Sequence, residues 1–320
     1  MTGPVPTLRM DLNVGTSWSL PSWSSGPHGD EQAVLEAARA AGYRGVQGAN
    51  PRRCGELGLI PTTFGIHDTP GGLLEQARRW SDSGFACCTL MLGTGLEDDD
   101  TAARLVDEVL SASTTAGIPL YVETHRATLT QDAWRTVRLV DRFPDLRFNG
   151  DSSHWYTGLD LSFGDFEAKL DHLTPVFDRV RYLHGRIGTP GCIQVDVGDG
   201  RAVDRPHVDH FRALWMRTMA GFMANVPDDP VVAPDIELGF APELLPPETG
   251  YARLVTGRDG EPEEEGDRWS QALVLARIAT ECFAALVGAR APTAACPGDR
   301  KVRTGPDGHE AATAGEVPLW

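Results

Sequence analysis

The chain has 320 residues, of which 41% are hydrophobic, enough for a sizeable core, and no apolar run approaches the roughly 20 residues of a bilayer-spanning helix. The net charge of −16 argues against nucleic acid as a partner and favours divalent cations and neutral ligands, unless a local basic pocket overrides that field. The N-terminus lacks the basic and apolar regions of a secretory signal. We therefore expect a cytoplasmic protein that does not contact membranes.

Short apolar runs alternate with segments of helical periodicity from residue 8 to about residue 290, which is the pattern of repeated βα units. The predicted strands are residues 8–14, 43–47, 62–66, 87–92, 119–123, 146–151, 180–186 and 231–237. The predicted helices are residues 30–41, 51–57, 72–83, 98–116, 131–142, 165–178, 207–224 and 267–289. Eight such pairs predict an α/β fold, a closed (β/α)8 TIM barrel.

The barrel is predicted to be a single domain, residues 1–290, because no composition shift interrupts it. Residues 291–320 lack periodicity and are expected to form a disordered tail. Thr130 is expected to cap the helix that begins at residue 131. Within the long segment that follows the eighth predicted strand, we interpret the acidic run at residues 261–265 as a solvated loop.

Acids and a histidine end the last four predicted strands, and barrel enzymes place their active sites at that end. The four residues are Glu123, Asp151, His184 and Glu237. Converging carboxylates repel one another unless a proton or a cation neutralises them, and three carboxylates with one imidazole suit Mn²⁺, Mg²⁺, Co²⁺ or Zn²⁺. Each residue alone has a structural alternative as a helix cap or a hydrogen-bonded histidine. Their recurrence in four successive units favours a metal site.

Three motifs resemble the sugar isomerases and epimerases of the xylose isomerase-like TIM barrel family, which also contains endonucleases. They are ETHR at residues 123–126, DSSHW at residues 151–155 and HGRIG at residues 184–188, and the resemblance covers most of residues 8–290. It implies that Glu123, Asp151, His184 and Glu237 bind one divalent ion, with Mn²⁺ the preferred candidate. It also implies that His154 faces the substrate and that Arg186 contacts a substrate oxygen or orients Glu237.

The resemblance implies a sugar isomerase or epimerase in which the metal stabilises an enediolate and Glu123 and Glu237 act as acid and base. A sugar or glycoside is the expected substrate, and related barrels often form homodimers. His125 is an additional imidazole that can act as acid or base or make a structural hydrogen bond. Leu129 stands where ketose 3-epimerases carry a further Glu, and Arg186 is closer to the metal His than their substrate Arg, which argues against that reaction.

Three alternatives use the same scaffold. A lyase would expel a group from an oxidised glycoside through the same enediolate. A metal-dependent endonuclease would require a basic groove, which the net charge disfavours. A noncatalytic barrel that binds a small molecule would be expected to have lost at least one ligand.

Overall fold

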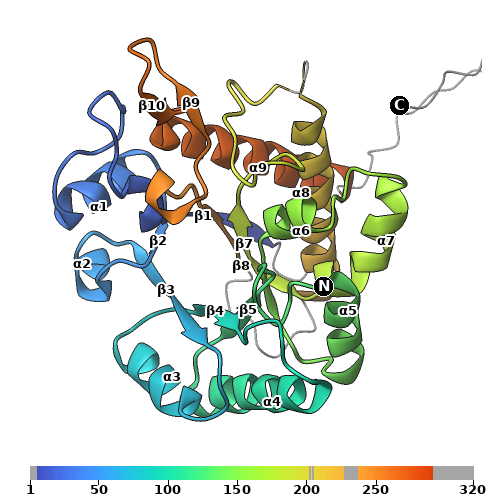
Figure 1. The fold of residues 1–320 in the computed structure, drawn as a ribbon. Coiled ribbons are helices and arrows are strands. Elements are labelled where there is room, and N and C mark those ends of the chain that lie inside the picture. Colours follow the sequence, from blue (N-terminus) through green and yellow to red (C-terminus); the bar gives the residue numbers. More distant parts are fainter. Residues whose placement is uncertain (1–5, 202, 204, 227–236, 291–320) are drawn as a thin grey trace, which may run out of the picture.

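The computed structural model describes residues 6–201, 203, 205–226 and 237–290. Eight parallel strands close into a barrel in chain order (Figure 1), as predicted. They are β1 (Thr7–Asn13), β2 (Gly45–Gln47), β3 (Ile60–His67), β4 (Cys88–Leu92), β5 (Leu120–Glu123), β6 (Phe148–Gly150), β7 (Val180–Gly185) and β8 (Glu237–Pro242). Pairing of β8 with β1 closes the barrel, with Thr7 opposite Glu237 and Met10 opposite Phe240.

Helices surround the barrel on the outside (Figure 1). They are α1 (Glu31–Ala40), α2 (Pro51–Glu56), α3 (Leu73–Asp82), α4 (Asp99–Ala116), α5 (Ala133–Arg142), α6 (Ser152–Gly158), α7 (Phe166–Phe177), α8 (Pro206–Asn225) and α9 (Arg268–Arg290). Most begin at an Asp or Asn whose side chain accepts a backbone N–H of the first turn, which satisfies a donor that has no partner within the helix.

The start of α5 differs from the prediction. Asp132, not Thr130, caps this helix, and its carboxylate accepts the backbone N–H of Arg135. The Thr130 hydroxyl instead donates to the carbonyl of Glu123 at 2.6 Å and accepts the backbone N–H of His125 at 3.0 Å. Thr130 therefore fixes the turn that follows β5, where the first predicted site residues lie.

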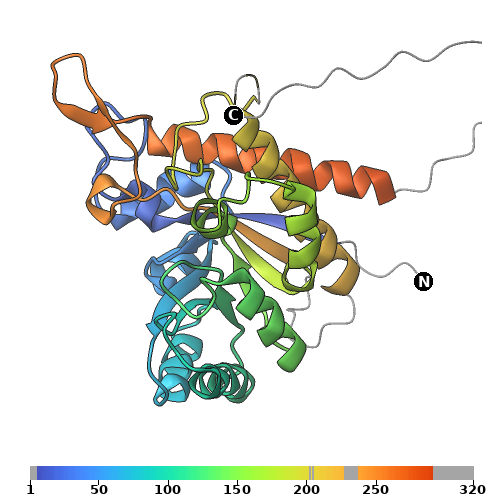
Figure 2. The same cartoon turned by 45° about the vertical axis from the view of Figure 1, so that its right-hand side comes forward.

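Helix α9 is, among the described residues, the one helix long and apolar enough by length and composition to cross a membrane. This differs from the expectation that no apolar segment reaches that length. The helix packs along α8 and β8, and its buried positions include Ala272, Leu275, Ala279 and Cys282. Their spacing of three and four residues is that of a helix with one face on a core. Figure 2 shows α9 running across the outside of the barrel beside α8.

The eighth strand is displaced from its predicted position. The prediction placed it at residues 231–237, of which residues 231–236 lie outside the described residues, whereas β8 begins at Glu237. The predicted tail, residues 291–320, also lies outside the described residues. The acidic run at residues 261–265 is not simply a solvated loop, because residues 262–264 of it form a strand. This strand, β10 (Pro262–Glu264), pairs with β9 (Leu254–Thr256) in a hairpin. Glu264 also forms an ion pair with Arg268 at 2.7 Å.

Candidate metal centre

The carboxyl ends of four strands bring three acids and one histidine together. Glu123 is the last residue of β5, and His184 lies near the end of β7. Asp151 and Glu243 follow β6 and β8 directly. One potential ligand atom of each residue lies within 4.8 Å of those of the other three. Three of the four predicted ligands therefore converge, and Glu243 completes the group.

Glu237 lies at the opposite end of the barrel, so its assignment to this site is wrong. It is the first residue of β8, where Arg44 Nη1 lies 2.5 Å from Glu237 Oε1 and Arg9 Nη1 lies 3.6 Å from Glu237 Oε2. A strand rises about 3.3 Å per residue, so the six residues from Glu237 to Glu243 span roughly 20 Å. The prediction failed because it took the start of the strand for its end. At this position Glu237 cannot act as the acid or base of the site.

One carboxylate oxygen of Asp151 accepts hydrogen bonds, and the other accepts none among the described residues. Oδ1 accepts the Ser153 backbone N–H at 2.9 Å and the Ser153 hydroxyl at 2.5 Å, which caps α6. Oδ2 is buried and accepts no hydrogen bond among the described residues, although Arg186 Nη2 lies 3.3 Å away. Burial raises the pKa of Asp151 against the lowering effect of Arg186, and Glu243 adds to the rise. A buried oxygen without a donor is a suitable position for a cation.

The side-chain amide of Gln47 orients the His184 ring on the side away from the carboxylates. His184 Nε2 lies 2.8 Å from Gln47 Oε1, the oxygen that also accepts Asn13 Nδ2 at 2.8 Å. Since Gln47 Oε1 can only accept, Nε2 carries the proton and Nδ1 faces the carboxylates. Nδ1 is 3.3 Å from Glu123 Oε1 and 3.4 Å from Glu243 Oε2. Burial lowers the pKa of His184, but the two carboxylates outweigh it and raise the pKa to about 10.

Arg186 holds Glu243 rather than Glu237, the partner that the sequence suggested. Its Nε donates to the Glu243 carbonyl at 2.9 Å, and its Nη2 pairs with Glu243 Oε2. The other carboxylate oxygen accepts Asn13 Nδ2 at 3.0 Å. Burial raises the pKa of Glu243, but the charges of His184 and Arg186 outweigh this effect and lower the pKa to about 2. Glu243 is therefore an ionised carboxylate in a fixed position.

The charges of this cluster fit one divalent ion. A metal ion bound at Nδ1 would displace the proton there and leave His184 neutral. Three carboxylates and the Arg186 guanidinium would then carry two negative charges, which a divalent cation cancels. The donor set of carboxylate oxygens and one imidazole nitrogen is accepted by several divalent metals. The buried His/Glu/Asp cluster is consistent with a divalent metal site, and Glu123, Asp151, His184 and Glu243 are the residues that would hold the ion.

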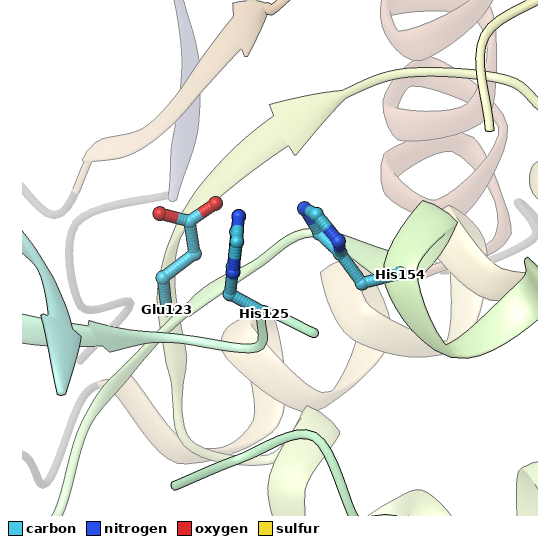
Figure 3. A group of neighbouring side chains, drawn as sticks. All are labelled: Glu123, His125 and His154. Carbon is cyan, nitrogen blue, oxygen red and sulfur yellow. The ribbon is translucent and has the colours of Figure 1, made fainter. Parts of the chain in front are cut away.

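Two further histidines lie beside the cluster (Figure 3). His125 follows β5 and His154 lies on α6, with ring centroids 3.9 Å apart. Neither ring nitrogen of the buried His154 has a hydrogen-bond partner among the described residues. Burial lowers the pKa of His154 well below its usual value, and the Arg186 charge lowers it further. His125 Nε2 lies 3.2 Å from the hydroxyl of Tyr251, so the tyrosine joins this group.

The sequence interpretation missed Glu243, Gln47, Asn13 and Tyr251. Glu243 had a signal, because it follows an apolar strand just as Asp151 does. Gln47 and Asn13 end β2 and β1, but an amide at a strand end is too common to indicate a site. Tyr251 lies in the loop after β8 and had no signal, because its contacts are with distant residues such as His125.

No protein-family model matches the chain, and no curated protein matches it. A solved xylose isomerase-like TIM barrel/4-hydroxyphenylpyruvate dioxygenase fusion protein is 15% identical with a TM-score of 0.50, and the alignment covers 91% of this chain and 46% of that one. Endonuclease IV from Thermus thermophilus is 15% identical (TM-score 0.43; 87% and 99% covered). The probable 3-DHS dehydratase AsbF of Bacillus anthracis is 13% identical (TM-score 0.46; 85% and 97% covered). The likeness to the fusion protein supports the fold, a (β/α)8 TIM barrel.

Proposed function

We propose that the chain is a metal-dependent isomerase or epimerase of a sugar or a related polyol, with Glu123 and Glu243 as its acid and base. The observation that carries this proposal is the placement of these two carboxylates around one point. They come from β5 and from the end of β8, and each lies within 3.4 Å of His184 Nδ1. Of two carboxylates that approach the substrate from different strands, one can remove a proton from a carbon. The other can return a proton to the opposite face of that carbon, which gives an epimer, or to the neighbouring carbon, which gives an isomer.

The remaining residues support this chemistry. A divalent ion held by the cluster would polarise a carbonyl and a hydroxyl oxygen of the substrate and thereby acidify the intervening C–H group. Arg186 holds the Glu243 carboxylate in place, and this carboxylate is ionised, as a proton acceptor must be. Glu123, 4% exposed, and His154, 1% exposed, lie in a region from which bulk water is largely excluded, which strengthens the electrostatic interactions there.

A lyase remains the second candidate, and the pair of His125 and Tyr251 favours it. The partly exposed imidazole of His125 lies 3.2 Å from the Tyr251 hydroxyl, close to Glu123. After a carboxylate removes the proton next to a substrate carbonyl, His125 can donate a proton to the oxygen that leaves the neighbouring carbon. Appearance of the released alcohol, rather than of an isomer, would identify this reaction.

The metal centre is tested by comparing Glu243→Gln with Glu237→Gln, two equivalent changes at opposite ends of β8. Elemental analysis of wild-type protein incubated with Mn²⁺ is expected to give about one ion per chain. Glu243→Gln is expected to lose most of this metal, whereas Glu237→Gln is expected to keep it. Equal metal content in the two variants would contradict the ligand set.

The reaction is tested with the metal-loaded protein in D₂O. Incubation with a range of aldoses and ketoses is expected to exchange a carbon-bound proton next to the carbonyl, which NMR detects, and to produce an isomer. Glu123→Gln and Glu243→Gln are both expected to abolish this exchange, and Glu237→Gln is expected to retain it. Release of a fragment would favour the lyase, and binding without any reaction would favour a noncatalytic barrel.

A further inference from the structure

The guanidinium of Arg186 has a donor that the described residues do not satisfy. Its Nε and Nη2 bind Glu243, and Nη2 also approaches Asp151 at 3.3 Å. Nη1 is buried and has no acceptor among the described residues. A buried charged donor without an acceptor is costly, so such groups normally meet a partner in the functional state. An acceptor oxygen from a ligand would satisfy Nη1.

A second guanidinium, that of Arg126, lies near this open donor. Two guanidinium groups pack against the ring of Tyr251, with the Cζ of Arg186 at 4.4 Å and the Cζ of Arg126 at 5.0 Å from its centroid. Guanidinium groups that stack on a ring keep their N–H donors free to bind acceptors in their own plane. Arg126 is exposed, and within the described part of the chain it forms no ion pair. Both arginines can therefore bind a ligand without displacing a carboxylate of the protein.

His154 adds a second unsatisfied group. Its ring is 1% exposed, and both nitrogens lack a hydrogen-bond partner among the described residues, although Asp151 Oδ2 lies 3.5 Å from Nε2. Figure 3 shows His154 across His125 from Glu123. The three side chains also satisfy the spacing of a cation site. However, the ring of His154 lies 6.0 Å from the ring of Tyr251, against which both Arg186 and Arg126 pack, and these two guanidinium charges favour an anion over a second metal ion.

The charge of the whole site indicates how much negative charge the ligand carries. A single divalent ion would neutralise the cluster of Glu123, Asp151, Glu243 and Arg186. The exposed Arg126, whose Cζ lies 5.0 Å from the ring centroid of Tyr251, then adds one positive charge beside the cluster. A ligand with one negative charge balances it, whereas a neutral sugar leaves it uncompensated. This local charge opposes the net charge of −16, which repels anions at long range.

We propose that the substrate is a sugar acid with one carboxylate, and that this carboxylate binds Arg186 Nη1 with support from Arg126 and His154. The proposal rests on the proposed function, which places the reacting carbons between Glu123 and Glu243. Charge-assisted hydrogen bonds to a guanidinium are among the stronger polar contacts in proteins, and they distinguish a carboxylate from a hydroxymethyl group of similar size.

The test measures binding by isothermal titration calorimetry, with metal content determined on the same samples. The ligands are D-glucuronate and D-galacturonate, their neutral counterparts D-glucose and D-galactose, and D-glucose 6-phosphate. At least one uronate is expected to bind about 10-fold or more tightly than its neutral counterpart, which corresponds to ~1.4 kcal/mol. Binding of the uronates no tighter than that of the neutral sugars, or preference for the phosphate, would overturn the carboxylate assignment.

Variants locate the subsite. Arg126→Gln and His154→Asn are each expected to reduce the preference for the uronate several-fold while metal content stays unchanged. Arg138→Gln is the matched control, since the Cζ of this arginine lies 4.8 Å from the ring centroid of Trp134 on α5, away from the site. It is expected to behave as wild type. An unchanged preference in both site variants would place the carboxylate elsewhere and overturn the proposal.

The two proposals fail in different ways. A protein that holds no metal but still prefers uronates through Arg126 would overturn the proposed function and leave the carboxylate subsite in place. A protein that holds its metal and exchanges protons on neutral sugars, without a preference for uronates, would overturn the subsite alone.

Discussion

The Gln47 amide lies outside the ligand group of the candidate metal centre and orients one of its residues, His184. Gln47 Oε1 accepts from His184 Nε2, and Gln47 Nε2 donates to the Thr89 hydroxyl at 3.1 Å, so the amide cannot turn over without losing both contacts. Asn149 Nδ2 donates to the same hydroxyl at 3.2 Å. Side chains of β2, β4 and β6 are thus joined by hydrogen bonds next to the cluster, and the contact with Gln47 Oε1 fixes the tautomer of His184.

Replacement of Gln47 by Leu is expected to weaken metal binding without removing a ligand. The variant loses the acceptor for His184 Nε2, so the ring can rotate and present either nitrogen. Loss of such a partner commonly costs about 10–100-fold in metal affinity. Titration with Mn²⁺ under identical conditions would measure the change. Gln32→Leu, on the exposed side of α1, is the control, and an unaltered Kd in Gln47→Leu would show that this contact does not matter.

At the scale of elements, one acid ties the loop after β1 to the start of α9. Asp267 accepts the hydroxyls of Ser24 at 2.5 Å and Ser270 at 2.8 Å, and the backbone N–H of Ser25 at 2.9 Å. Although partial burial raises the pKa of Asp267, these hydrogen bonds lower it to about 2. The folded protein therefore prefers the ionised carboxylate more strongly than the unfolded chain does.

This preference predicts how stability depends on pH. Because the folded pKa of Asp267 lies below its usual value near 3.8, its contribution is present above about pH 4 and is lost as the pH falls towards 2. The side chain is partly solvent-accessible, so we expect about 1 kcal/mol rather than the full value of the shift. Urea unfolding of wild type and Asp267→Asn is expected to differ by this amount at pH 7 and to converge near pH 2. A difference that grew towards low pH would contradict the assignment.

The order and type of elements could be predicted because each βα unit carries its own periodicity. Strand ends were less predictable, since an apolar run does not say where pairing begins. The ends of β5 and β7 were predicted to within one residue, which placed Glu123 and His184 correctly. Apolar residues precede both Glu237 and Glu243, so the sequence offered two candidates for the end of the strand. The register of β8 with β1, which pairs Thr7 with Glu237, decides that Glu243 lies at the mouth.

For the molecule as a whole, metal binding is expected to raise stability, because the four ligands come from four different strands. An unfolded chain cannot bring them together, so the ion binds the folded state only. At a free Mn²⁺ concentration about 100 times the Kd, the free energy of unfolding is expected to rise by about 2.7 kcal/mol. For a domain of this size that corresponds to a rise in Tm of roughly 5 °C.

Thermal unfolding with and without Mn²⁺ measures this effect. Glu243→Gln is expected to lose the rise, and Glu237→Gln is expected to show it in full. Stabilisation of the two variants by the same amount would mean that the ion binds outside the cluster.

By itself, the sequence determined that the chain builds eight βα units in order and that Glu123, Asp151 and His184 end or follow successive strands. These features follow from local periodicity and from the short distance between a strand end and the next residues. The tertiary structure decided the rest. The pairing of β8 with β1 that closes the barrel places Glu243, and not Glu237, in the cluster. The packing of the loop after β8 places Tyr251 next to Arg186 and His125. Both depend on contacts between residues more than 60 positions apart in the chain, which no local pattern encodes.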